Sequence, residues 1–160
     1  MTADHRGYPL RTIEVAVTVR AAQSEVWRHL VAWQTQENWM LGTSVWAIDS
    51  GEGVGGRLAA FTGLLPKSRK LGFIDYMTIT RWEPPRICDV LHTGKIVRGT
   101  GSFEVVVMSD KLSEFVWREN VEVPFGALGQ LFWPIASRLI RVGIILSLRR
   151  FATYVEVLNE

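Results

Sequence analysis

The fold of this chain depends on residues 125–160, which read FGALGQLFWPIASRLIRVGIILSLRRFATYVEVLNE. Between Gly126 and Leu148 the only charged residues are Arg138 and Arg141. A surface helix needs only one apolar stripe, because its other face meets water, and this segment is too apolar for that pattern. We therefore predict one long helix with apolar partners on more than one side.

The apolar side chains of this helix form two stripes when residues are placed at about 100° from one another. The first stripe contains Leu128, Leu131, Phe132, Ile135, Leu139, Val142 and Leu146. The second stripe, on the opposite side, contains Trp133, Ile140, Ile144, Leu148, Phe151, Val155 and Leu158. We expect one stripe to pack on a sheet, whereas the other requires a helix, a subunit, a membrane or a bound ligand.

Pro134 interrupts the helical pattern, because it has no N–H to donate to the carbonyl of Gln130. Two arrangements are open at this point. Either the proline bends one continuous helix, or the main helix begins at Pro134 and residues 126–133 form a separate turn. In both arrangements Trp133 points in a different direction from the residues that follow it.

The chain before this helix alternates between apolar and other side chains in a way that is typical of strands. Residues 13–19 form the first such segment. Helical spacing then predicts a helix over 24–33, and a short second helix or turn is expected at 37–40. Turn signals separate about six further strands, at 45–49, 57–62, 73–82, 87–93, 102–108 and 113–123. Gly94, Gly99 and Gly101 are interpreted as bends between them.

Helices that stand apart from a meandering sheet predict an α+β fold with an antiparallel sheet. At 160 residues, 48% of them hydrophobic, the chain is expected to form one domain over 1–160. Residues 1–10 are expected to be a flexible N-terminus. No repeat or low-complexity linker is visible in the sequence.

Composition argues against several classes of function. The net charge is +2, and the densest basic run, Lys67, Arg69 and Lys70, is interpreted as a solvated turn rather than a nucleic-acid site. Cys88 is the single cysteine, which excludes an internal disulfide and a CxxC site. The N-terminus lacks a signal-peptide pattern. Any stretch long enough to span a bilayer contains Arg138 or Arg141, so we expect a cytoplasmic protein without a transmembrane segment.

Three segments, in a fixed order, carry a family resemblance. They are the helical pair at 25–30 and 38–40, the glycine-rich stretch 53–57, and residues 117–126 followed by 147–151. In this order they resemble the START-like helix-grip superfamily, often labelled SRPBCC, which includes polyketide cyclases and lipid-transfer proteins. The resemblance covers nearly the whole chain.

The resemblance implies a strongly curved antiparallel sheet of about six to seven strands wrapped around the C-terminal helix. It also implies two short helices after the first strand, and a mostly apolar cavity between sheet and long helix. Because the superfamily contains both binding proteins and enzymes, the fold does not name an activity.

Residues 51–56 read GEGVGG and match the G-x-G-x-x-G pattern by letters. A dinucleotide site requires this loop between a strand and the N-terminus of a helix, where backbone amides meet the pyrophosphate. Strands are predicted on both sides here, so we interpret the stretch as a hairpin connection. No cofactor is expected.

Glu119 is the first candidate for chemistry. It shares a face of its predicted strand with Trp117, Val121 and Val123, and an acid on an apolar face is costly unless it is paired. Glu119 is therefore a candidate ligand anchor or general acid–base group. The alternative is that it pairs with a neighbouring Arg or Tyr only to hold the strand.

His92 is the second catalytic candidate, because it is the only histidine in the middle of the sheet region. A lone histidine in a strand is more often a hydrogen-bonded structural residue. The sequence shows no Ser-His-Asp or Cys-His order that would recruit it into a triad. No His, Cys or acidic residues have metal-ligand spacing, so no metal site is expected.

The aromatic side chains could line a pocket for a flat or lipid-like ligand, although some of them must belong to the core. The residues predicted to bind the ligand are Trp39, Tyr76, Phe103, Trp117, Glu119, Phe132, Trp133 and Leu139.

Three functions remain open from the sequence. The first is binding of a small hydrophobic or aromatic molecule, such as a lipid or polyketide, in an internal cavity. The second is a polyketide cyclase- or dehydratase-like enzyme that uses Glu119 or His92 to move a proton. The third is an interaction protein, a homodimer or a membrane-surface protein, in which Trp133, Ile140 and neighbouring residues of the second stripe (Ile144 and Leu148) contact the partner.

Overall fold

A computed structural model describes residues 9–65, 68–123 and 125–159 of this chain. Within them, seven strands form one sheet. The strands are β1 Leu10–Val19, β2 Thr43–Ala47, β3 Arg57–Leu65, β4 Lys70–Glu83, β5 Ile87–His92, β6 Gly99–Ser109 and β7 Leu112–Glu122. The helices are α1 Gln23–Leu30, the 3₁₀ helix η1 Trp33–Asn38, and α2 Gly126–Leu158.

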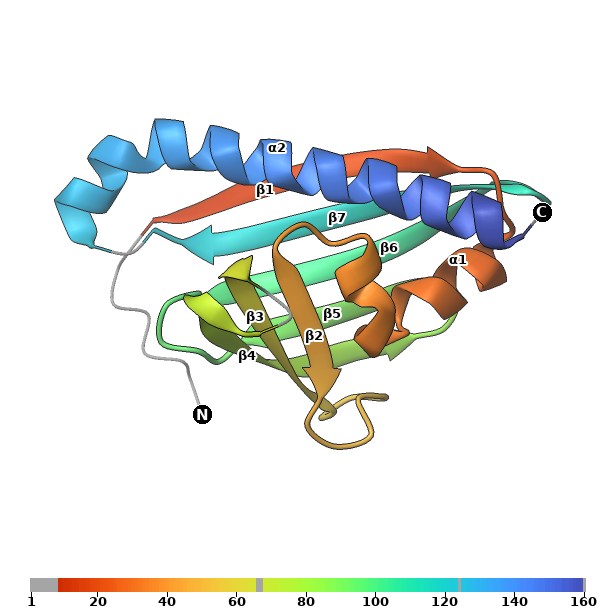
Figure 1. Cartoon of the computed structure of the whole chain (residues 1–160), viewed down its shortest axis with the longest axis horizontal. Coiled ribbons are helices and arrows are strands. Elements are labelled where there is room, and N and C mark those ends of the chain that lie inside the picture. Colours follow the sequence, from red (N-terminus) through yellow and green to blue (C-terminus); the bar gives the residue numbers. More distant parts are fainter. Residues whose placement is uncertain (1–8, 66–67, 124, 160) are drawn as a thin grey trace.

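The sheet is antiparallel throughout, with the strand order β1-β7-β6-β5-β4-β3-β2. It curls beneath α2, which lies along the edge strand β1, while α1 lies toward the right-hand end and η1 lies beside β2 (Figure 1). The predicted α+β helix-grip architecture, with two short helices after the first strand, is confirmed.

Both edges of the curled sheet are tied to α2. On the β1 side, the backbone N–H and the guanidinium of Arg20 donate to the carboxylate of Glu156, each at 2.9 Å. On the β2 side, the backbone N–H of Leu41 donates to Ser147 Oγ at 2.9 Å. The helix therefore closes the concave face of the sheet.

The core lies between the C-terminal half of α2 and the sheet. Every buried residue of α2 falls between Ile144 and Val155. The ring of Phe151 packs against Trp39 and Phe115, with ring centroids 4.8 Å and 5.0 Å apart. Aromatic pairs in such edge-on contact are worth about 1 kcal/mol each beyond the area they bury. This half of α2 is the core helix of the fold.

The two stripes of α2 meet different surroundings. The second stripe supplies Ile144, Leu148, Phe151 and Val155 to the core, so our hypothesis that Ile144 and Leu148 contact a partner is wrong. The first stripe is the uncovered one, and its side chains are 42% to 71% exposed. Both stripes have the same spacing of apolar residues. Only the position of the helix on the sheet determines which stripe is buried and which is exposed.

Length and hydropathy alone would allow α2 to cross a membrane. Its most apolar window has a mean hydropathy of 1.6, and 17% of that window is buried. Some of the apolar residues of α2 are those of its C-terminal half, which pack against the sheet. The others belong to the exposed first stripe.

Several boundaries differ from the prediction. The second short helix lies at 33–38 rather than 37–40, where the indole N–H of Trp33 donates to the carbonyl of Gly51 at 2.8 Å. Helix α2 is continuous through Pro134, so the separate turn at 126–133 is not formed. Its first turns bend away from the axis of the rest (Figure 1). The expectation for residues 1–10 falls outside the described residues except at Pro9 and Leu10.

The glycine-rich stretch 51–56 connects β2 to β3, two antiparallel neighbours, as the sequence predicts. Asp49 organises the connection, because its carboxylate accepts from the backbone N–H groups of Gly51 and Arg57. These bonds, with that to the guanidinium of Arg57, hold the pKa of Asp49 near 2. A helix N-terminus does not follow the loop, so a dinucleotide site is not formed.

Candidate ligand-binding cavity

A cavity of about 380 Å³ lies between the concave face of the sheet and α2. Its walls come from η1, α2 and most strands of the sheet. They are mostly apolar, as the lining residues Ile13, Leu58, Val90, Phe103, Val121 and Ile144 illustrate. A volume of this size falls within the range of small-molecule sites, which is roughly 300–1,000 Å³.

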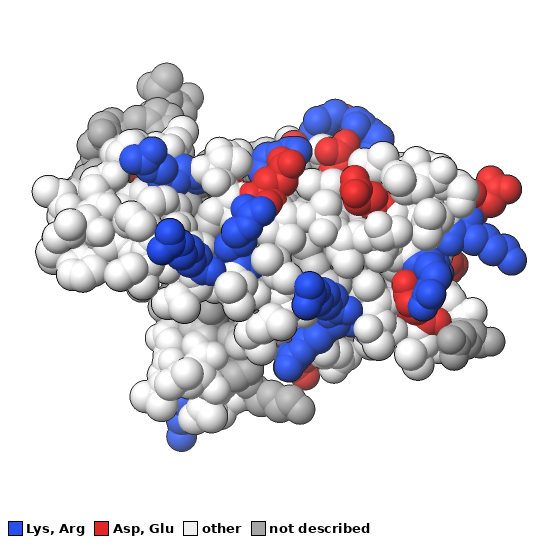
Figure 2. Space-filling view, turned by 90° about the horizontal axis from the view of Figure 1, so that it is seen from above, with Lys and Arg blue, Asp and Glu red and all other residues white. Residues whose placement is uncertain are grey.

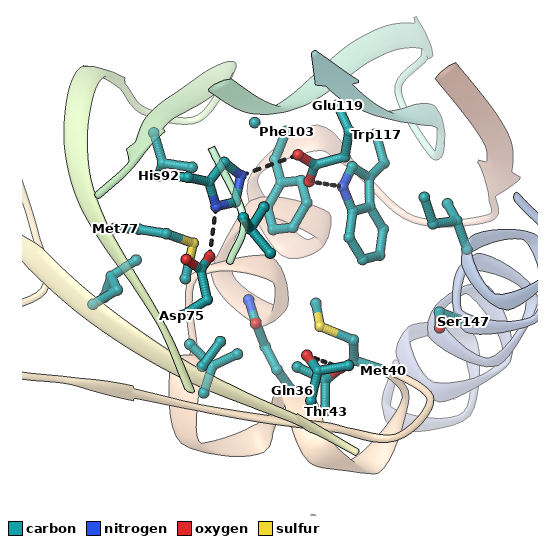
Figure 3. Close-up of a pocket in the computed structure, with 18 of the residues that line it drawn as sticks. Gln36, Met40, Thr43, Asp75, Met77, His92, Phe103, Trp117, Glu119 and Ser147 are labelled. Carbon is teal, nitrogen blue, oxygen red and sulfur yellow. Dashed lines mark hydrogen bonds and ion pairs between the residues drawn. The ribbon is translucent and has the colours of Figure 1, made fainter. Parts of the chain in front are cut away.

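Three ionisable side chains meet at one wall of this cavity, and we call them the acidic array: Asp75, His92 and Glu119 (Figure 3). His92 Nδ1 lies 2.5 Å from Asp75 Oδ2, and His92 Nε2 lies 3.1 Å from Glu119 Oε2. The indole N–H of Trp117 donates to Glu119 Oε1 at 2.6 Å. The imidazole thus bridges two carboxylates.

The register of the sheet explains how these side chains meet. His92 is paired with Met77 on β4, and Asp75 lies two residues from Met77 on the same face. On the other side, β6 separates His92 from Glu119, but it presents Gly99 opposite His92 and Gly101 opposite Glu119. Because these positions carry no side chains, the imidazole and the carboxylate bond across β6.

Gly101 allows a close approach of its neighbours. A Cβ atom at this position would lie 3.1 Å from Glu119 Oε1 and 3.1 Å from Val90 Cγ2. The prediction of a bend at Gly101 is wrong, since Gly101 lies inside β6, whereas Gly99 is the first residue of β6 and has φ +122°. Glycine in a strand interior is typical of such a close approach.

The acidic array is largely withdrawn from water. The side chains of Asp75 and His92 are 7% and 8% exposed, and that of Glu119 is 17% exposed. Burial by itself lowers the pKa of His92, but the hydrogen bonds and negative charges of Asp75 and Glu119 outweigh it and raise this pKa to about 9. At neutral pH the ring is an imidazolium that donates both N–H groups to carboxylates.

Charge on the array does not cancel. Two carboxylates and one imidazolium sum to one negative charge inside a mostly apolar cavity. In addition, Asp75 Oδ1 is buried and has no hydrogen-bond partner among the residues that the structure describes. Buried acceptors without a partner are costly, and they are common where a ligand or ordered water completes the site.

The opposite wall is polar but neutral. The side-chain amide of Gln36 donates to the carbonyl of Leu30 at 2.8 Å, and the hydroxyls of Thr43 and Thr62 lie 3.2 Å apart. Ser147 Oγ accepts from Leu41 and donates to the carbonyl of Gly143 at 2.8 Å. Gln36, Thr43 and Ser147 lie across the cavity from the acidic array (Figure 3).

Cys88 also lines the cavity, where burial raises the pKa of its thiol to about 12. A thiol that does not ionise at neutral pH is a poor nucleophile. Among the residues that the structure describes, no group of three His, Cys, Asp or Glu side chains is arranged to hold a metal ion.

The structure brings some of the predicted site residues together. Phe103, Trp117 and Glu119 line the cavity, as does the catalytic candidate His92. Trp39 is fully buried in the aromatic core, and Trp133 packs against the edge of that core. Their assignment to ligand binding stays a prediction.

The other three predicted residues point away from the cavity. Tyr76 is 47% exposed, because it follows Asp75 on β4 and alternation turns it to the convex face. Phe132 and Leu139 are 55% and 69% exposed, because both belong to the outward stripe of α2. The sequence pattern did not indicate which stripe faces the sheet.

Asp75 belongs to the site but was not predicted from the sequence. Its signal was present, since Phe73, Asp75, Met77 and Ile79 share one face of β4 and Asp75 is the only charged member. A single acid on an otherwise apolar strand face is the same pattern that singled out Glu119.

Comparison with known proteins yields similar folds at low sequence identity. TTHA0849 from Thermus thermophilus superposes with a TM-score of 0.78 and 11% identity, over 94% of this chain and 100% of that one. A START superfamily protein from Mycobacterium smegmatis gives a TM-score of 0.73 and 12% identity, over 92% and 98%. The Zhui aromatase/cyclase from Streptomyces sp. R1128 gives 0.71 and 17%, over 92% and 94%.

At these identities the likeness concerns the fold alone, and it shows that this chain has the START-like helix-grip fold. No protein-family model matches the sequence. No curated protein matches it either.

Proposed function

We propose that this protein binds a small hydrophobic or aromatic molecule, such as a lipid or polyketide, in the cavity between the sheet and α2. The observation that carries the proposal is the mostly apolar cavity of about 380 Å³. Such a cavity favours an apolar ligand, because the ligand removes apolar surface of both partners from water. Similar folds include START proteins and aromatase/cyclases, which supports a ligand-binding role.

Apolar contact supplies the affinity in this proposal. A ligand that buries roughly 300 Å² of apolar surface gains roughly 7 kcal/mol before the costs of binding. The acidic array then orients the ligand, since it is the charged feature of an otherwise apolar wall. The predicted ligand contacts Phe103, Trp117 and Glu119 belong to this surface.

Two neighbouring residues of α2 offer a matched test. Gly143 lines the cavity, and a Cβ atom there would meet open space, so Gly143→Phe places a ring in the cavity. Val142 is 53% exposed on the outer face, so Val142→Phe adds the same ring outside. Uptake of a fluorescent apolar probe should be lost in the Gly143 variant and kept in the Val142 variant.

Native mass spectrometry after gentle purification provides the second measurement. We expect a bound compound on the wild-type protein and on the Val142→Phe variant, and none on the Gly143→Phe variant. Equal probe uptake by all three proteins would place the binding elsewhere and refute the cavity as the site.

The second candidate function is an acid–base enzyme of the cyclase or dehydratase type. The hydrogen-bonded pair of His92 and Glu119 favours it, because a cavity-facing carboxylate beside an imidazolium can accept a proton from a bound substrate. With a polyketide substrate, Glu119→Gln should abolish turnover while uptake of an apolar probe is kept. Unchanged turnover would remove Glu119 from the mechanism.

The third candidate function is contact with a membrane surface through the outer stripe of α2. The stripe is exposed, and the segment 123–155 contains Arg138, Arg141, Arg149 and Arg150 but no acidic residue. An apolar face with only basic charges matches an anionic lipid surface better than a second copy of itself, because two such faces repel each other.

A further inference from the structure

The net charge of the side chains that line the cavity is negative. Among the described residues that line it, none is Lys or Arg, and the only cationic group is the imidazolium of His92. That imidazolium has already given both of its N–H groups to Asp75 and Glu119. No cationic donor is therefore left for a ligand.

The atoms that remain available at this wall are acceptors. An ionised carboxylate accepts hydrogen bonds and donates none, and each of its oxygens can accept more than one. Glu119 is the most exposed member of the acidic array, at 17%, so its carboxylate is the one that a ligand can reach. A ligand head group that meets this wall must supply a proton donor.

On the basis of the proposed function, we infer that the cavity selects ligands with an apolar body and a hydrogen-bond-donating head, a hydroxyl or an ammonium, and rejects carboxylate or phosphate heads. A donor head bonds directly to Glu119 within the acidic array. An anionic head would lie beside two carboxylates in a medium of low dielectric constant, where repulsion between like charges is strong.

The far wall does not rescue an anionic head. Gln36, Thr43 and Ser147 are uncharged, and each is engaged in a hydrogen bond within the protein. A ligand turned end for end would place its apolar body against the acidic array, so this orientation does not satisfy the carboxylates. The array therefore decides the class of head group.

Three ligands with ten carbon atoms each test the inference: decanol, decylamine and decanoate. Each is titrated at neutral pH against wild-type protein loaded with a fluorescent apolar probe. Decanol and decylamine should each displace the probe at a concentration at least about tenfold lower than decanoate, a ratio that corresponds to about 1.4 kcal/mol. The ratio of the first two shows whether a neutral or a charged donor is preferred.

Two variants of β7 test whether the acidic array, rather than the rest of the cavity, determines the preference for a head group. Glu119→Gln removes one negative charge and should bring the decanol-to-decanoate ratio close to one. Glu114→Gln, on the opposite face of the same strand, should leave the ratio unchanged. Thermal unfolding of each variant establishes that it is folded.

The outcomes distinguish this inference from the proposed function. If the probe enters the wild-type cavity but the three ligands displace it equally, or decanoate displaces it best, the ligand class is wrong and the binding function stands. If the probe does not enter the cavity, both the proposed binding function and the inferred preference for donor head groups are wrong.

Discussion

His92 is a buried histidine whose ring nitrogens are both bonded to carboxylates. The two carboxylates overcome the effect of burial and raise its pKa to about 9. The pKa of His29, in contrast, is lowered from 6.5 by burial and by the charge of Arg28. Of the two histidines within the described residues, His29 should therefore have a pKa below the ordinary value of 6.5 and His92 a pKa above it.

Ring-proton NMR titration tests this prediction directly. We expect His29 to lose its proton below pH 6.5 and His92 to keep its proton until about pH 9. Because the folded-state pKa of His92 is raised, its stabilising contribution is complete below about pH 6.5 and is lost as the pH rises through about 9. That contribution is on the order of a few kcal/mol.

Urea unfolding at several pH values gives the matching stability measurement. The free energy of unfolding of the wild-type protein should exceed that of His92→Gln by the largest margin below pH 6.5, and the margin should shrink above pH 9. A His92 ring that titrates near 6.5, with a margin independent of pH, would contradict the bridging arrangement.

Gly101 gives a second prediction at the scale of single residues. Gly101→Ala places a Cβ atom 3.1 Å from Glu119 Oε1, so the carboxylate must move. We expect the pKa of His92 to fall, because one of its two carboxylates is displaced. The same NMR titration measures the shift, and an unchanged His92 midpoint would show that the added methyl group leaves the bond between His92 and Glu119 in place.

At the scale of the elements, the strands could be predicted from the sequence, but the side chains that their pairing brings together could not. Alternation along Ile13, Val15, Val17 and Val19 and the turn signals between later runs depend on near neighbours only. The acidic array depends on the register of β4, β5, β6 and β7, which places Asp75, His92 and Glu119 together. No local pattern encodes that register, so Glu119 and His92 were predicted singly and their bond was not.

Helix α2 shows the same limit. The spacing of its apolar residues predicted two stripes, and both exist. Which stripe faces the sheet follows from tertiary contacts such as the bond between Leu41 and Ser147. The sequence therefore left Phe132 and Leu139 as candidates for the cavity, although they point outward.

Gly143 provides the prediction for this element. It lies inside α2, and a Cβ atom there meets no atom within 4 Å. Gly143→Ala should raise the free energy of unfolding by about 0.5–1 kcal/mol, because alanine loses less backbone entropy in a helix. Differential scanning calorimetry should show a higher Tm.

Gly99→Ala is the matched contrast within β6. Gly99 has φ +122°, and a Cβ atom there would lie 1.9 Å from the carbonyl oxygen of Asn120. This variant should lose stability by more than Gly143→Ala gains. A fall in Tm for Gly143→Ala would mean that the cavity side of α2 is more tightly packed than the structure shows.

Across the whole molecule, exposed apolar area gathers on the outer face of α2. Figure 2 shows this face, where the end formed by the first turns of α2 is broadly uncharged and is bordered by Lys and Arg. Leu131 and Leu139 are 71% and 69% exposed, and contiguous apolar patches larger than about 400 Å² usually mark an interaction site. The exposed stripe lies opposite the side of α2 that lines the cavity, so ligand and membrane surface would occupy different sides of one helix.

Binding to lipid vesicles tests the surface role. The wild-type protein should co-sediment with vesicles that contain anionic phospholipid, and less so at high salt, because each Arg near such a surface contributes about 1 kcal/mol. Replacing Leu131 and Leu139 together by Ser should weaken binding by at least about tenfold, since each loses several buried carbon atoms. Val54→Ser, at a 72% exposed position in the loop between β2 and β3, should have no effect. A concentration-dependent dimer in sedimentation velocity, with no vesicle binding, would assign the outer face of α2 to a second copy of the chain instead.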